Sequence, residues 1–205
     1  NIDYKFQDYF DKNIVNKIKR ITKKIDLITF TNVFAHIDDL DKLINNLKLL
    51  VSNDTLIIIE NHYLGSILKY NQFDTFYHEH PRTYSLESFR FIAKKLEMNI
   101  VNYTLPKRYG GNIRVYFQKN KSKKLTKIKS ESNIYNKFKK MNKFINDWKI
   151  NFKIEIEKYN KIYGPLRAKA FPGRASILIN TLKLSNKNIY AVYEKDESLK
   201  INHYV

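Results

Sequence analysis

The chain has 205 residues with a formal net charge of +18, and it contains 15 tyrosines, 13 phenylalanines and no cysteine. Its length and aromatic content predict one large or two small folded domains and exclude a disordered chain. The missing cysteines exclude disulfides, thiolate zinc sites and cysteine nucleophiles from this chain, and they favour a reducing, cytoplasmic compartment. No apolar run approaches the ~20 residues of a membrane helix, so we expect no membrane partner.

The positive charge comes almost entirely from lysine, with 31 lysines against 7 arginines. Recognition of base edges and phosphates favours arginine, whose planar fork lysine lacks. Lysine, isoleucine and asparagine make up 80 residues, and their A/T-rich codons allow a genomic base bias to explain the composition. We therefore expect no nucleic-acid partner. A lysine-rich nucleic-acid-binding module that uses residues 119–161 is the alternative function, and its binding would fall steeply with salt.

The first half of the chain predicts an α/β unit. Residues 25–30 read as a buried strand, residues 38–50 as a helix with one apolar face, and residues 56–59 as a parallel strand covered on both faces. The order strand, helix, strand indicates a right-handed crossover. Ligands of such sheets bind at the carboxyl ends of the strands, and His36, Glu60 and His62 fall at that edge.

Ser85 is placed to cap a further helix, and two strand-like segments follow at residues 99–105 and 112–118. The glycine pair Gly110-Gly111 between these segments predicts an antiparallel hairpin. A parallel α/β sheet that ends in such a hairpin is typical of class I methyltransferases.

The C-terminal part predicts a second α/β unit. Apolar and aromatic residues recur every three or four positions from Ile134 to Tyr159, which predicts one amphipathic helix of about 30 residues that ends near Gly164. We interpret its aromatic stripe as core packing. A helix over residues 175–184 and a strand over residues 188–193 are expected to follow.

Proton-handling groups concentrate in Tyr77-His78-Glu79-His80, which contains two of the five histidines of the chain. If this segment is extended, residues 77 and 79 point to one side and residues 78 and 80 to the other. A carboxylate beside an imidazole favours its charged form, which suits a general base. Two alternatives stay open: a polar surface loop, and a metal site in which Asp74 joins the two histidines.

The sequence resembles a known family in several stretches. It is similar to the S-adenosylmethionine-dependent sugar C-methyltransferases that act on nucleotide-linked keto-sugars, from about residue 25 to residue 118. The segments that carry the resemblance are Asn32–Ile37, Gln72–His80, Tyr84–Leu86 and Gly110–Val115.

The resemblance implies catalytic roles for four residues. His80 corresponds to the general base, Tyr77 and Glu79 to its neighbours, and His36 to a further histidine of the pocket. An imidazole would remove the weakly acidic proton next to the ketone, and Tyr77 or His36 would donate to the enolate oxygen.

The resemblance also implies binding roles. Asn32 would contact the cofactor, S-adenosylmethionine, while Asn112 and Arg114 would bind the nucleotide-sugar substrate, and no metal is expected. The family has Ser at the position of Asn112, and both side chains form hydrogen bonds.

Other features of the family are not found in the sequence. The 24 residues before Ile25 contain no glycine, so the glycine-rich cofactor loop is missing, as is the cysteine-rich zinc module. We therefore expect a partial methyltransferase domain at 1–118, the C-terminal half of a Rossmann-like sheet. A lysine-rich linker at 119–130 and a partial C-terminal α/β domain at 131–205 would follow. On this interpretation the chain is a fragment that is inactive alone.

Overall fold

The computed structural model describes residues 2–119, 131–170 and 173–194. These residues divide into two compact units. The first unit takes its described residues from 1–67 and 79–132, and the second takes them from 68–78 and 133–205. The predicted linker lies almost wholly outside the described residues, and the predicted domain boundaries remain a prediction.

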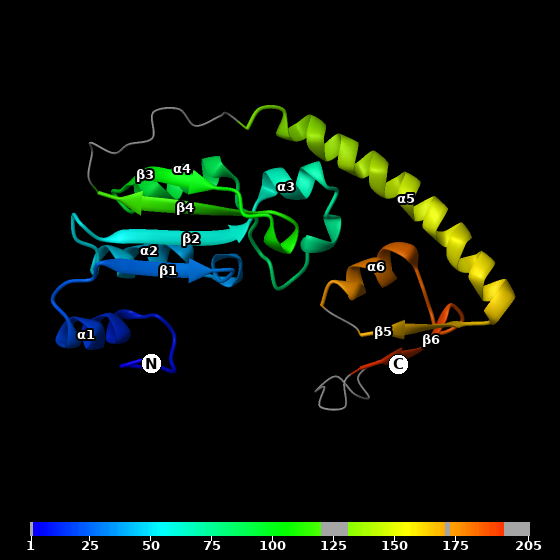
Figure 1. Ribbon diagram of the computed structural model, residues 1–205, viewed down its shortest axis with the longest axis horizontal. Coiled ribbons are helices and arrows are strands. Elements are labelled where there is room, and N and C mark those ends of the chain that lie inside the picture. Colours follow the sequence, from blue (N-terminus) through cyan, green and yellow to red (C-terminus); the bar gives the residue numbers. More distant parts are fainter. Residues whose placement is uncertain (1, 120–130, 171–172, 195–205) are drawn as a thin grey trace. The chain divides into compact units, whose positions relative to one another are not determined.

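The first unit is built on a four-stranded mixed sheet in the order β1-β2-β4-β3 (Figure 1). β1 and β2 are parallel, and β4 is antiparallel to both of its neighbours, β2 and β3. This arrangement confirms the predicted α/β fold class and the antiparallel hairpin. The elements from the N-terminus to β4 are α1 (Lys12–Ile21), β1 (Leu27–Thr31), η1 (Phe34–His36), α2 (Leu40–Lys48), β2 (Leu56–His62), α3 (Leu64–Lys69), η2 (Phe73–Thr75), α4 (Leu86–Lys95), β3 (Asn99–Thr104), η3 (Arg108–Gly110) and β4 (Asn112–Gln118).

Side chains at the helix starts fix where α2 and α4 begin. The carboxylate of Asp39 accepts a hydrogen bond from the backbone of Lys42 at 2.9 Å. Ser85 and Ser88 form a reciprocal capping pair, in which each hydroxyl accepts from the backbone N–H of the other residue. The predicted cap at Ser85 is therefore confirmed.

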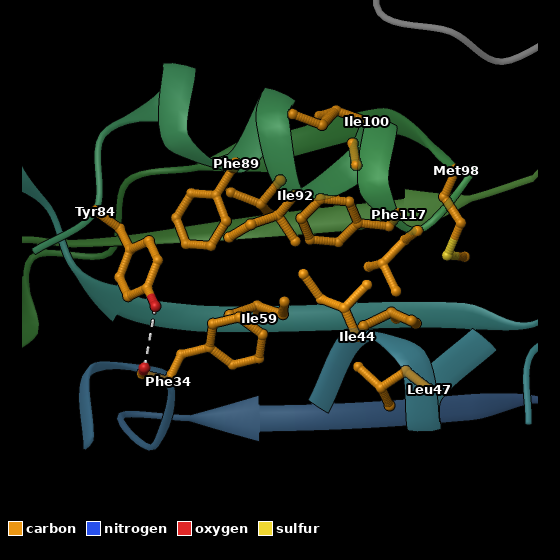
Figure 2. Packing of buried hydrophobic residues seen from close by; sticks show 14 of the residues in the cluster. Phe34, Ile44, Leu47, Ile59, Tyr84, Phe89, Ile92, Met98, Ile100 and Phe117 are labelled. Atoms are coloured by element: carbon orange, nitrogen blue, oxygen red, sulfur yellow. Dashed lines mark hydrogen bonds between the residues drawn. The ribbon is translucent and has the colours of Figure 1, made fainter. Parts of the chain in front are cut away.

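The hydrophobic core lies between one face of the sheet and the helices α2 and α4 (Figure 2). Alternate residues of β2 and β4 supply the sheet side, and the apolar faces of both helices supply the other. The largest fully buried members are Phe34, Phe89 and Phe117. The opposite face of the same strands carries Glu60 and His62 on β2 and Asn112 and Arg114 on β4, so the polar residues of the sheet gather on the face away from this core.

The second unit contains α5 (Ile134–Tyr163), β5 (Leu166–Lys169), α6 (Ala175–Leu182) and β6 (Ile189–Tyr193), with β5 and β6 paired in parallel. The long helix ends as predicted at Gly164, which has a positive φ of 73°. The expectation that its aromatic stripe is core packing is wrong for Phe152 and Tyr159, which are exposed, and Phe138 and Trp148 are only half-buried. The buried residues of this helix are Met141 and Ile156.

Two further expectations differ from the structure. The segment at Tyr77–Glu79 forms a bend and a turn instead of a strand, so the predicted alternation of its side chains is wrong. The strand β5 and the helix α1 were not predicted. β5 has only four residues, and α1 begins at Asp11, whose carboxylate accepts from two backbone N–H groups. None of the helices in the described part of the chain is both long enough and apolar enough to cross a membrane.

Candidate functional site

Polar side chains gather where β1 and β2 end and β4 begins. Asn32 directly follows β1, and its backbone N–H donates to the carbonyl of Glu60 at 2.8 Å. In the antiparallel register Glu60 lies opposite Arg114 and His62 lies opposite Asn112. Residues directly opposite on neighbouring strands project from the same face, about 5 Å apart at their Cβ atoms. The sheet therefore presents these side chains together at one edge.

A buried carboxylate organises this edge. Oε1 of Glu60 accepts from Arg108 Nε at 2.6 Å and from Asn112 Nδ2 at 2.9 Å, and Oε2 accepts from Arg114 Nε at 2.7 Å. The side chain of Glu60 is 2% exposed, whereas those of Arg108 and Arg114 are 48% and 37% exposed. We call these four residues the Glu60 cluster.

The ionisation of Glu60 follows from its partners. Burial opposes the charged form, but the hydrogen bonds from Arg108, Asn112 and Arg114 outweigh it and hold the pKa of Glu60 below its ordinary value. Glu60 is therefore a carboxylate at neutral pH. Because a carboxylate that already accepts several hydrogen bonds is a poor proton acceptor, this residue holds its neighbours in place and does not act as a base.

The side chain of Asn112 is fully buried, and its amide oxygen is an acceptor without a donor in the described part of the chain. Its Nδ2 donates to both Glu60 and Asn32 Oδ1, the latter at 3.1 Å, and these two bonds fix the orientation of the amide. Its Oδ1 has no hydrogen-bond partner among the described residues. An unsatisfied buried acceptor costs about 1–3 kcal/mol, so the two bonds from Nδ2 hold this amide in place at the expense of its oxygen.

Three imidazoles form a second group, which we call the imidazole cluster. The ring centroids of His36 and His80 are 4.7 Å apart, and those of His62 and His80 are 5.4 Å apart, both in edge-on arrangements. His36 is exposed, and His62 and His80 are half-buried. The three rings are therefore close to one another and accessible to solvent.

The segment from His80 to Tyr84 brings these rings together. The guanidinium of Arg82 donates to the carbonyls of Ile37 and Asp38, directly after His36. The buried hydroxyl of Tyr84 donates to the carbonyl of Phe34 at 3.1 Å, just before His36 (Figure 2). Both sides of His36 are thereby fixed against the chain that carries His80.

Contacts with the end of β2 place His62 beside the same segment. Tyr63 forms an isolated parallel bridge with Tyr84, and the N–H of Leu64 donates to the carbonyl of Tyr84 at 2.9 Å. Burial raises the pKa of Tyr84 to about 12, so its phenol stays protonated and remains a donor at neutral pH.

A strained turn precedes β4. Tyr109 has a left-handed φ of 54°, and Gly110 and Gly111 follow with φ of 80° and 115°. Left-handed geometry costs a residue with a side chain about 1–2 kcal/mol. The ring of Tyr109 is 6.4 Å from that of His62, so this turn borders the imidazole cluster.

The structure unites some of the predicted site residues and leaves the others apart. His36 and His80 lie together, and Asn32, Asn112 and Arg114 are joined through the Glu60 cluster. Glu79 is exposed in the turn next to His80. Tyr77 belongs to the second unit, where its ring contacts His78 at 5.7 Å.

Three residues of the site were not predicted as members: Glu60, His62 and Arg108. The sequence already placed Glu60 and His62 at the carboxyl end of a strand. A polar residue directly after an apolar run was therefore the signal that could have identified them as site residues. Within the described residues, no three side chains of His, Cys, Asp or Glu are arranged to hold a metal ion.

Comparison with known proteins relates this chain to methyl transfer. Residues 3–103 match a family described as a methyltransferase domain. The chain is also 36% identical over 83 residues to the C-methyltransferase NovU of Streptomyces niveus, a match that covers 40% of this chain and 20% of NovU. The chain thus spans about a fifth of the length of the curated relative that it matches.

The sheet order with its antiparallel β4 is that of part of a Rossmann-like class I methyltransferase fold. Methyltransferase domains in general use S-adenosylmethionine as methyl donor. The fold and the two matches together support methyl transfer in general, and residues 3–103 are the part of the chain that is similar to a methyltransferase domain.

Proposed function

We propose that the protein methylates a carbon next to the ketone of a nucleotide-linked sugar, with His80 as the general base. The observation that carries this proposal is the imidazole cluster at the carboxyl edge of the sheet, with His36 and His62 on either side of His80. The similarity to a protein named as a C-methyltransferase supports carbon as the acceptor atom.

The imidazoles supply the groups that such a reaction needs. A neutral ring nitrogen of His80 takes the proton from the carbon next to the ketone, and the bonding electrons move into an enolate. His36, whose ring centroid is 4.7 Å from that of His80, donates a hydrogen bond to the enolate oxygen. S-adenosylmethionine, when bound, would supply the methyl group that the enolate carbon takes, and would leave as S-adenosylhomocysteine with the electrons of the broken sulfur–methyl bond.

The residues at the strand ends are suited to hold the two ligands. Asn32 lies at the end of β1, where ligands of α/β sheets bind, and we assign it to the cofactor. We assign Asn112 and Arg114 to the sugar, because both lie on the polar face of β4 at this edge of the sheet and the side chain of Arg114 is 37% exposed. Tyr77 and Glu79 remain proposed neighbours of the base.

The proposal is tested by exchange of the sugar proton with deuterated solvent in the full-length protein, followed by NMR. His80→Asn should slow this exchange by about 10²–10⁴-fold, the usual contribution of a positioned general base, while cofactor affinity stays nearly unchanged.

His78→Asn is the matched control, because it removes the other histidine of the same turn. It should exchange at close to the wild-type rate. Wild-type exchange in His80→Asn would show that another group is the base.

A further inference from the structure

The turn between β3 and β4 displays a cation and an aromatic ring at the edge of the imidazole cluster. Both lie in η3, whose first two residues are Arg108 and Tyr109. Tyr109 is 62% exposed although its backbone is held in the left-handed region. Strained residues persist only where their surroundings fix them, and such residues cluster at ligand sites. The turn is therefore a candidate for recognition of a ligand.

Several contacts fix the shape of this turn. The N–H of Gly111 donates to the carbonyl of Arg108 at 3.0 Å, and the N–H of Asn112 donates to the carbonyl of Pro106 at 2.9 Å. A Cβ on Gly111 would lie 2.5 Å from Oγ of Ser66, so the chain passes too close to Ser66 for any other residue. The turn is preorganised before a ligand arrives.

The guanidinium of Arg108 has donors to offer a ligand. A guanidinium has five N–H groups, and the bond from Nε to Glu60 uses one of them. Because Glu60 is shared with Arg114, one carboxylate balances two cations and the Glu60 cluster retains a net positive charge. The exposed part of Arg108 is thus suited to an anion, and the planar fork matches a phosphate with two parallel hydrogen bonds.

A chain of ring contacts links this turn to the imidazole cluster. The ring of Tyr109 is 6.4 Å from His62, and His62 is 5.4 Å from His80. The guanidinium of Arg108 lies 5.7 Å from the ring of Tyr109. These contacts form a continuous chain from Arg108 through Tyr109 and His62 to His80, so a ligand bound to Arg108 would lie in the same region as the proposed base, with an aromatic ring beside it.

We propose that Arg108, oriented by Glu60 and flanked by Tyr109, binds the diphosphate of the substrate and so sets its preference for a nucleotide-linked sugar over the free sugar. This inference rests on the proposed function for the identity of the ligand. Glu60 is a positioning residue in it, because it acts through Arg108.

The test is titration calorimetry of a nucleoside diphosphate into the 205-residue chain, with the corresponding nucleoside as the uncharged probe. Arg108→Gln should weaken binding of the diphosphate by about 10–100-fold, the range for hydrogen bonds to a charged group. It should leave binding of the nucleoside unchanged. Arg108→Lys, which keeps the charge but not the fork, should fall between wild type and Arg108→Gln.

Arg90→Gln is the matched control. Arg90 also pairs with a carboxylate, that of Glu87 at 2.9 Å, but on the exposed face of α4. The Arg90→Gln variant should bind the diphosphate as tightly as wild type does. Any of three results would overturn the anion site. Wild type and Arg108→Gln could bind the diphosphate equally tightly, Arg108→Gln and Arg90→Gln could lose the same affinity for it, or wild type could fail to bind it. Proton exchange in His80→Asn decides the proposed function independently of these outcomes.

Discussion

The Glu60 cluster and the imidazole cluster share one edge of the sheet but are built in opposite ways. Glu60 is buried and receives hydrogen bonds at both of its oxygens from three side chains. The imidazoles of His36, His62 and His80 contact one another edge-on, and all three are exposed or half-buried. The first cluster encloses its central charge, and the second presents its rings to solvent.

The difference separates the residues that hold the site from those that are able to react. A buried carboxylate with a lowered pKa is a fixed anion, which suits it to orient neighbouring cations. An accessible imidazole has two ring nitrogens that can donate or accept a proton, so it can exchange one with a ligand. Substitution of Glu60 should therefore change stability, and substitutions in the imidazole cluster should mainly change activity.

The largest stability effect is expected for Glu60→Ala. Removing one partner of a buried ion pair costs about 3–5 kcal/mol. Because Arg108 and Arg114 are partly in water and can rehydrate, we expect a loss of about 2–4 kcal/mol in the free energy of unfolding, measured with urea. His36→Asn, at the exposed end of the imidazole cluster, should change it by less than about 0.5 kcal/mol.

The pH dependence of this effect has a definite sign. Since the folded protein lowers the pKa of Glu60, its contribution is present above the ordinary carboxylate pKa and is lost as the pH falls through the folded value. The difference between wild type and Glu60→Gln should therefore shrink in acid. A difference that grows in acid would contradict the assignment of Glu60 as a carboxylate.

An intermediate effect is expected for Gly111→Ala. The new methyl group would meet Ser66 at 2.5 Å, and the backbone at φ 115° is unfavourable for alanine. A loss of about 1–3 kcal/mol follows from the backbone alone. Gly164→Ala is the control, because Gly164 also has a positive φ, but no atom lies within 4 Å of the place that a Cβ would take. If both variants lose the same stability, the close approach to Ser66 has no energetic role.

A smaller loss is expected for Tyr84→Phe, which removes the bond that ties Tyr84 to Phe34 beside His36. The loss should be about 0.5–1.5 kcal/mol at neutral pH. The folded protein raises the pKa of Tyr84 to about 12, so this contribution is fully present below the ordinary phenol pKa and is lost as the pH rises through the folded value. Unfolding measured in parallel at alkaline pH should show the difference between the two proteins shrinking. A difference that stays constant would mean that the folded protein does not favour the protonated phenol.

Much of the fold could be predicted from local patterns. The continuous apolar run of β2, the capped helix α4 and the glycine pair before β4 each carry a signal within about ten residues. The turn at Tyr77–Glu79 could not be predicted, because its residues suit a strand and a loop equally well. β5 has four residues, which are too few to show the alternation of apolar and polar side chains that marks a strand.

The site was predicted only in part, because only some of its residues belong to a recognisable local pattern. His36 and His80 belong to distinctive local stretches, whereas Arg108 reads as one basic residue in a turn. Its function in the site depends on Glu60, which is 48 residues away in the sequence. No local pattern encodes that pairing, because it forms only when β4 lies beside β2 and the turn before β4 is near Glu60.

The sequence separation of the residues bonded to Glu60 also bears on when the site forms during folding. They join residues 48, 52 and 54 positions apart, and the bond between Asn32 and Asn112 spans 80 positions. Contacts of such separation form only after the intervening loops have closed, which is slow and entropically costly. All four need β4 to insert between β2 and β3. We therefore expect the bonds at this edge to form together with the pairing of β4 to β2, and not before it.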